Sequence, residues 1–167
     1  MTRILSIDPS SNKAVKSNTG VVLLDNGNLV NYWVVSYGKK GFKEWFKKNH
    51  SNIDYDIAIY EHFEARDNNK SKDNTVLETI DEITKLIPTI VPFRNAGYST
   101  DVPNELLKAI GLWDFGKSHH DDVRAAARLG IFYAVRNDIE DFVNGVGKEL
   151  YERGALNVKR NTKYNIS

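Results

Sequence analysis

The first third of the chain is dominated by short β-branched runs separated by turn residues. Mostly apolar runs occupy 4–7, 19–24 and 29–35, and Asn26-Gly27 separates the last two runs. An Asn-Gly pair between two strands favours a two-residue hairpin turn, because it tolerates the positive φ angles that this turn requires. We therefore expect a strand, then an antiparallel strand pair, with the polar link 10–18 forming an exposed loop.

The apolar spacing changes to a helical period after residue 40. Phe42, Trp45 and Phe46 predict a helix over 41–49 whose outer face carries several lysines. Those lysines are either a solvated surface or a surface that contacts phosphates.

The next segment predicts a parallel βαβ crossover: a strand over 56–61, a helix over 75–87 ended by Pro88 and a strand over 89–93. Two more helices are expected, over 102–112 and 118–135.

These elements predict an α/β fold: a mixed five-stranded sheet, an antiparallel hairpin meander followed by parallel βαβ, with helices on both faces. With 167 residues, one domain over 1–157 and a polar, flexible tail over 158–167 are expected. The absence of cysteine excludes zinc ribbons and thiol nucleophiles, so any metal must bind to oxygen or imidazole. No apolar run approaches the ~20 residues of a membrane span, and a cytoplasmic location with no membrane partner is the default expectation.

Two carboxylates follow buried strands directly. Asp8 ends the first predicted strand and Glu61 ends the fourth. If these strands are parallel neighbours, both acids lie side by side at their carboxyl ends, where open α/β sheets bind ligands.

A third acid begins the predicted helix 118–135. At about 100° per residue, His119 and Asp122 share the face of Val123, Ala126 and Leu129, so both are expected to point toward the sheet. Asp121 points the other way, beside Arg124. A neutral buried histidine remains the alternative for His119, and a favourable helix dipole remains the alternative for Asp122.

A cation offers a reason to bury such groups. Asp8, Glu61, Asp122 and an imidazole form an oxygen-rich ligand set suited to Mg²⁺, with Mn²⁺ as the alternative ion. Two such ions about 4 Å apart support in-line phosphodiester hydrolysis. The sequence therefore predicts a two-metal nuclease.

The motifs ILSIDPSSN and TGVVLLDNG, DIAIYEHF, and KSHHDDVRAA together resemble RuvC-type Holliday junction resolvases of the RNase H-like superfamily, phage-encoded forms above all. The resemblance runs from about Ile4 to Val135 and implies an RNase H-like fold. It also implies that Asp8, Glu61, His119 and Asp122 are catalytic metal ligands, with Asp121 as the second choice for the fourth ligand.

The resemblance further implies a homodimeric endonuclease in DNA recombination and repair, acting in a bacterial or phage-infected cell. It would cut four-way junctions, with forks and three-way junctions as further candidate substrates, to leave 5′-phosphates. Phe63 is a candidate to stack on an unpaired base or else a core residue, and Lys108 and Lys117 are candidate phosphate contacts. The basic residues of the polar segments add further candidate DNA contacts: Lys13, Lys16, Arg66, Lys70 and Lys72. A catalytically inactive junction-binding protein on the same fold is the alternative.

Overall fold

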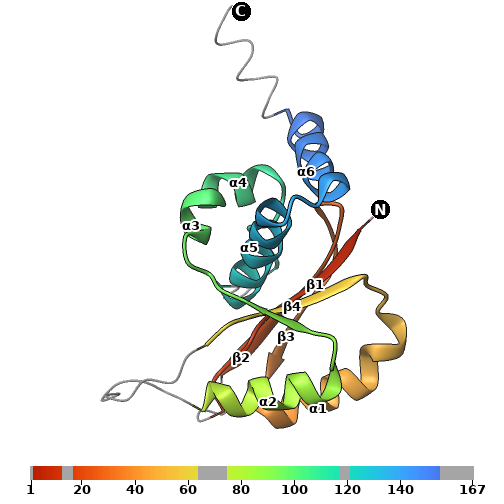
Figure 1. The fold of residues 1–167 in the computed structure, drawn as a ribbon, viewed down its shortest axis with the longest axis vertical. Coiled ribbons are helices and arrows are strands. Elements are labelled where there is room, and N and C mark those ends of the chain that lie inside the picture. The colour runs from red at the N-terminus through yellow and green to blue at the C-terminus, as the bar shows by residue number, and fades with distance from the viewer. Residues whose placement is uncertain (1, 13–16, 64–74, 117–120, 155–167) are drawn as a thin grey trace, which may run out of the picture.

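The computed structural model describes residues 2–12, 17–63, 75–116 and 121–154. Within these residues, five strands form one sheet in the order β3-β2-β1-β4-β5 (Figure 1). Their bounds are β1 Arg3–Asp8, β2 Asn18–Asp25, β3 Asn28–Ser36, β4 Ile57–Glu61 and β5 Val91–Phe93. The β1-β2 and β2-β3 pairs are antiparallel, whereas β1-β4 and β4-β5 are parallel. The predicted mixed sheet is confirmed.

The hairpin between β2 and β3 turns at Asn26-Gly27, as predicted. Asn26 has φ 50° and Gly27 has φ 91°, which is the pair of positive angles that a type I′ turn requires. The Asn26 side chain also accepts a hydrogen bond of 2.7 Å from the backbone N–H of Thr2. The turn is thereby fixed to the start of β1.

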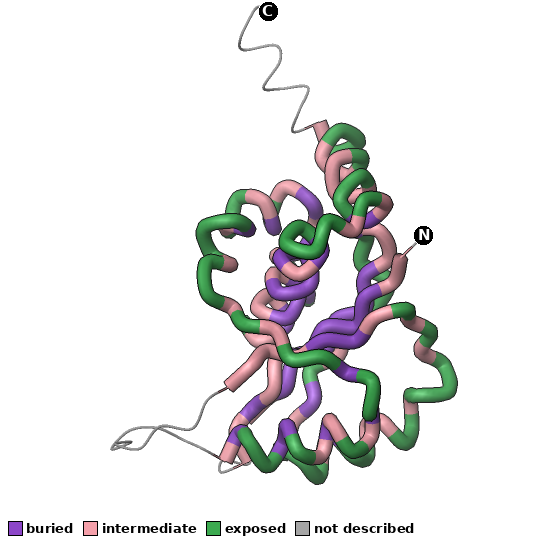
Figure 2. The backbone as a smooth tube through the Cα atoms, viewed as in Figure 1, coloured by how far each residue is buried: buried purple, intermediate pink, exposed green. Residues whose placement is uncertain are grey.

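Side chains alternate between the two faces of the sheet, and each face has its own core. The buried residues are concentrated along the central strands and on α5 (Figure 2). Leu5 and Ile7 of β1 pack with helix α1, Gly38–Asn49, and helix α2, Val76–Leu86. Ile4 of β1 and Ile59 of β4 pack on the opposite face, against helix α5, Asp121–Arg136. Any further side chain with the same parity on these strands therefore faces α5.

Three more helices lie around α5: α3, Tyr98–Asp101; α4, Asn104–Ala109; and α6, Glu140–Glu152. A short 3₁₀ helix, η1, covers His50–Asn52 after α1. The sequence reading did not place α3, η1 or α6. Among the described helices, none is long and apolar enough to cross a membrane.

Helix α6 was missed because Gly145 and Gly147 weaken its helical pattern. Gly145 has a packing role: a Cβ atom there would lie 1.7 Å from the carbonyl oxygen of Asn26. The glycine lets α6 lie directly on the β2-β3 turn. Phe142 anchors the same helix in the core with no exposed surface.

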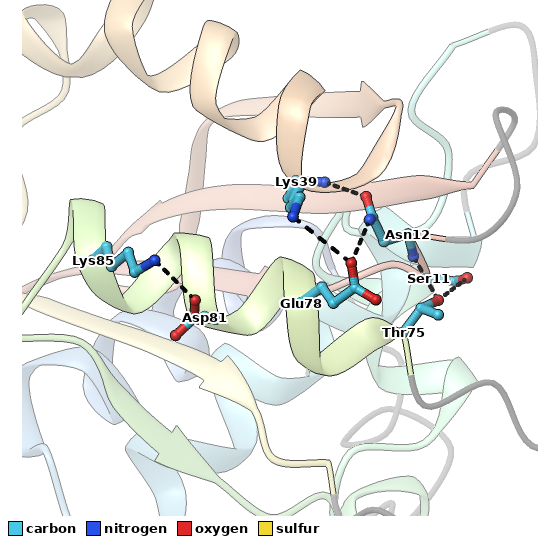
Figure 3. A network of polar contacts seen from close by, with 7 residues as sticks. All are labelled: Ser11, Asn12, Lys39, Thr75, Glu78, Asp81 and Lys85. Carbon is cyan, nitrogen blue, oxygen red and sulfur yellow. Dashed lines mark hydrogen bonds and ion pairs between the residues drawn. The ribbon is translucent and has the colours of Figure 1, made fainter.

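The expectation of an exposed loop after β1 is wrong for its described start. Ser10 is buried, and its backbone N–H donates to the hydroxyl of Thr19 over 3.1 Å. Asn12 is held by three hydrogen bonds of 2.9–3.0 Å, to Thr75, Glu78 and the backbone N–H of Lys39 (Figure 3). Side-chain hydrogen bonding therefore ties this segment to the first turns of α1 and α2.

Candidate active site

Asp8 and Glu61 lie side by side on the α5 face of the sheet. Ile7 of β1 pairs with Tyr60 of β4, so the next step of the parallel register places Asp8 opposite Glu61. Asp8 lies four residues after Ile4, and Glu61 lies two residues after Ile59. Because every second side chain of a strand points to the same face, both acids face α5, as Ile4 and Ile59 do. The two carboxylates therefore emerge at one edge and into one layer.

Helix α5 brings Asp122 to the same edge, and Gly20 permits its close approach. Gly20 of β2 pairs with Asp8. A Cβ atom on Gly20 would lie 2.2 Å from the carbonyl oxygen of Asp122 and 2.8 Å from the nitrogen of Val123. Only a residue without a side chain lets the first turn of α5 rest on β2 at this point. The pairing across β1 and β2 thus sets Asp122 beside Asp8.

The three carboxylates form one electrostatic cluster. Burial raises the pKa of Asp8 well above its usual range, and the negative charges of Glu61 and Asp122 raise it further. Burial likewise raises the pKa of Glu61. The pKa of Asp122 is raised by burial and then by the charge of Asp121. Desolvated acids that repel one another are typical of functional sites, and a bound cation relieves the repulsion.

Two further polar residues border the cluster, and the sequence reading missed both. Asn95 follows β5 and donates a side-chain hydrogen bond to Glu61, which opposes the rise of that carboxyl's pKa. Tyr98 begins α3, and burial raises the pKa of its hydroxyl, followed by the charges of Glu61 and Asp8. Because Phe93 pairs with Glu61, the residue two positions after Phe93 lies at the same sheet edge. The pairing of β5 with β4 is therefore the feature that identifies Asn95 as a neighbour of Glu61.

Asp121 lies on the outer surface of α5. Its side chain is 88% exposed, and a carboxylate oxygen lies 3.4 Å from a guanidinium nitrogen of Arg124. Arg124 in turn stacks on the ring of Trp113, 3.9 Å from its centroid, and Lys108 lies 4.8 Å from the same centroid. The geometry favours Asp122 over Asp121 as the residue that faces the other acids.

The remaining candidate residues divide by their place in the structure. Phe63 is half-buried, is absent from both core clusters, and stays a candidate for base stacking. Lys108 is exposed on α4. The other candidates lie outside the described residues: Lys13, Lys16, Arg66, Lys70, Lys72, Lys117 and His119.

The chemistry of the site fits a divalent cation. Among the described residues, no three Asp, Glu or His side chains lie close enough together to hold a metal ion as they stand, so the fit rests on the type of the residues. The described acids nevertheless supply three carboxylates at one sheet edge, and Asp8 is close enough to the other two for their charges to shift its pKa. Hard oxygen ligands of this kind suit Mg²⁺, which keeps several of its waters.

Comparison with known proteins supports the fold. No protein-family model matches the chain, and no curated protein shows a significant match to it. Among solved structures, Thermus thermophilus RuvC in complex with a Holliday junction substrate matches with a TM-score of 0.57. The match covers 84% of this chain and 98% of that chain at 12% identity. A second Thermus thermophilus RuvC structure matches at 11% identity and the same TM-score, over 82% of this chain and 96% of that chain.

The chain therefore has an α/β fold of the RNase H-like kind. More narrowly, its fold is RuvC-like, as the motifs of the sequence indicated.

Proposed function

We propose that this protein is a divalent-cation-dependent endonuclease that cleaves branched DNA, four-way junctions foremost, and leaves 5′-phosphates. The observation that carries the proposal is the convergence of Asp8, Glu61 and Asp122 at one edge of a RuvC-like sheet. The solved structure of similar fold is described as bound to a Holliday junction, which supports branched DNA as the substrate class.

Each residue has a distinct part in the proposed chemistry. Asp8, Glu61 and Asp122 would hold the cations, with His119 as the proposed fourth ligand. When bound, divalent cations lower the pKa of water and stabilise negative charge on phosphate oxygens. Asn95 orients the Glu61 carboxylate through its hydrogen bond. Tyr98 and the first turn of α5 border the cluster.

A homodimer completes the proposal. Resolution of a four-way junction requires two symmetric cuts, and a twofold pair of subunits supplies two equivalent sites.

A catalytically inactive junction-binding protein is the competing proposal. A binding protein would gain nothing from directing three carboxylates toward the phosphates that it binds, because like charges repel.

The test uses the full chain with labelled four-way, three-way and linear DNA, in Mg²⁺ and in chelator. We expect cleavage of branched DNA only with the cation. Asp8→Asn and Asp122→Asn should abolish cleavage while junction binding persists. Asp81→Asn is the matched control, since Asp81 is exposed on α2 and pairs with Lys85 at 3.1 Å. Wild-type rates in either site variant would refute the site, and junction binding without any cleavage would favour the inactive binding protein.

A further inference from the structure

Helix α1 carries a concentrated positive charge that the proposed site does not use. Five of its twelve residues are exposed lysines, which we call the lysine face: Lys39, Lys40, Lys43, Lys47 and Lys48. Glu44 is the one acid in the helix, so α1 has a net charge of +4 (five minus one). The whole chain has a net charge of +1, so the rest of it sums to −3.

The core fixes the direction in which the lysine face points. Phe42 is fully buried, and Trp45 packs edge-on against Trp33 of β3 with ring centroids 5.2 Å apart. At about 100° per residue, Lys40, Lys43, Lys47 and Lys48 lie on the side of the helix away from these aromatic side chains, whereas Lys39 lies at the border and reaches Glu78 of α2. These four lysines therefore point away from the protein.

The charges at the start of α1 disfavour the helix, whereas Lys47 and Lys48 in its last turn suit the negative end of the helix dipole. No acid lies in its first turn, where Lys39 and Lys40 stand against the positive end of the helix dipole. Lys39, Lys43 and Lys47 follow one another at i,i+4 spacing, where like charges disfavour a helix. Among the described residues, only Lys39 of this face has an ion pair, at 3.8 Å from Glu78. An external anion would compensate this arrangement.

The lysine face begins close to the candidate active site. The backbone N–H of Lys39 donates to the side chain of Asn12, which follows Asp8 by four residues (Figure 3). Four residues span at most ~14 Å, which limits the separation of Asp8 and Asn12. From this contact α1 extends away from the Asn12 network, and the rise from Lys40 to Lys47 is ~10.5 Å. DNA phosphates on one strand advance ~3.4 Å along the axis, so the face spans about three of them.

The acids and the lysine face lie in different layers of the fold. The acids face α5, whereas α1 covers the opposite side of the sheet. A straight duplex bound at the acids therefore does not extend along α1. A branched DNA has arms that diverge from the cleavage point, and one of them can pass over the shared sheet edge.

We propose that the lysine face binds the phosphate backbone of an arm of branched DNA other than the arm that is cut. This inference rests on the proposed function and adds a second DNA contact surface to it. The contact is independent of base sequence, because lysine ammonium groups bind phosphates as point charges.

The test compares two matched double variants of the full chain. Lys43→Gln/Lys47→Gln removes two lysines of the face, and glutamine keeps the helix propensity. Lys85→Gln/Lys148→Gln removes two exposed lysines elsewhere as the control. Binding to a four-way junction and to a linear duplex is measured without divalent cations over a range of salt concentrations. Each lost phosphate contact lowers the slope of log affinity against log salt by about 0.9.

We expect the junction slope of Lys43→Gln/Lys47→Gln to fall by about 1.8, with a smaller change for linear duplex and no change in the control. An unchanged junction slope, or an equal change for junction and linear duplex, would overturn the inference. A variant that loses self-association while keeping the wild-type junction slope would assign the face to protein contact and overturn it too. The proposed function is tested separately by wild-type cleavage of junctions, so the two failures are distinguishable.

Discussion

Replacement of Gly20 by alanine tests whether the close approach of α5 to β2 sets the active site. The new Cβ would lie 2.2 Å from the carbonyl oxygen of Asp122, against an ordinary contact distance of at least 3.4 Å. The first turn of α5 must therefore move by about 1.2 Å, the difference of these two distances. A displacement of about 1 Å at a reacting centre costs about 100-fold in rate. We expect a loss of this order in junction cleavage.

Two glycine controls separate this effect from a general loss of packing. In Gly130→Ala the Cβ meets a terminal methyl of Leu24 at 2.9 Å, farther along the same helix. That variant should lose stability without a comparable loss of cleavage. Gly147→Ala has no neighbouring atom within 4 Å and should stabilise α6 by about 0.5–1 kcal/mol.

The measurements are single-turnover cleavage of a labelled four-way junction and thermal unfolding of each variant. Overpacking in Gly20→Ala should cost about 1–3 kcal/mol of unfolding free energy, which leaves the protein folded at assay temperature. Cleavage by Gly20→Ala within about threefold of the wild-type rate would refute the reasoning. An equal loss of rate in Gly130→Ala would show that the effect does not depend on Asp122.

Three more predictions concern the acids. Because folding raises the pKa of Asp8, the metal-free wild type should lose stability as pH rises from about 4 through that raised pKa. Asp8→Asn should reduce this loss, leaving the part that comes from Glu61 and Asp122. The same variant should raise the melting temperature at pH 7 by about 2–4 °C and abolish stabilisation by Mg²⁺. A lower melting temperature for Asp8→Asn at pH 7 would contradict this. Asn95→Ala removes the hydrogen bond that lowers the pKa of Glu61. The acidic limb of the pH–rate profile should therefore move to higher pH, with a rate loss of about tenfold. An acidic limb at its wild-type position would count against a positioning role for Asn95. Asp121→Asn should retain most of the cleavage activity, as measured beside Asp122→Asn, and equal losses would mean that the outer acid also acts in the site.

The fold was predictable because its signals are local. The Asn26-Gly27 turn requires two positive φ angles that few other residue pairs tolerate, and the adjoining runs are rich in β-branched residues. The positions of Asp8 and Glu61 at strand ends could also be read directly, because each carboxylate follows a mostly apolar run of strand length. Their convergence was an inference from topology, which the parallel register of β1 and β4 supports.

The parts that the sequence did not reveal depend on contacts between distant segments. Asn95 contacts Glu61 only because β5 pairs with β4 in one particular register, and a three-residue strand carries almost no periodic signal. Gly20 resembles any glycine in a strand until the position of α5 is known. Helix α6 contains two glycines, so its stability comes from packing on the β2-β3 turn and not from its own propensity.

The alternation of side chains along β1 and β4 constrains how such a protein can evolve. A substitution within one of these strands alters the packing only locally. Inserting or deleting one residue would instead turn the acid at the end of the strand to the opposite face of the sheet. Asp8 would then lie among the side chains under α1 and α2, with no partner acid. The number of residues between the core and each acid is therefore a stricter requirement than the identity of the apolar residues within the strand.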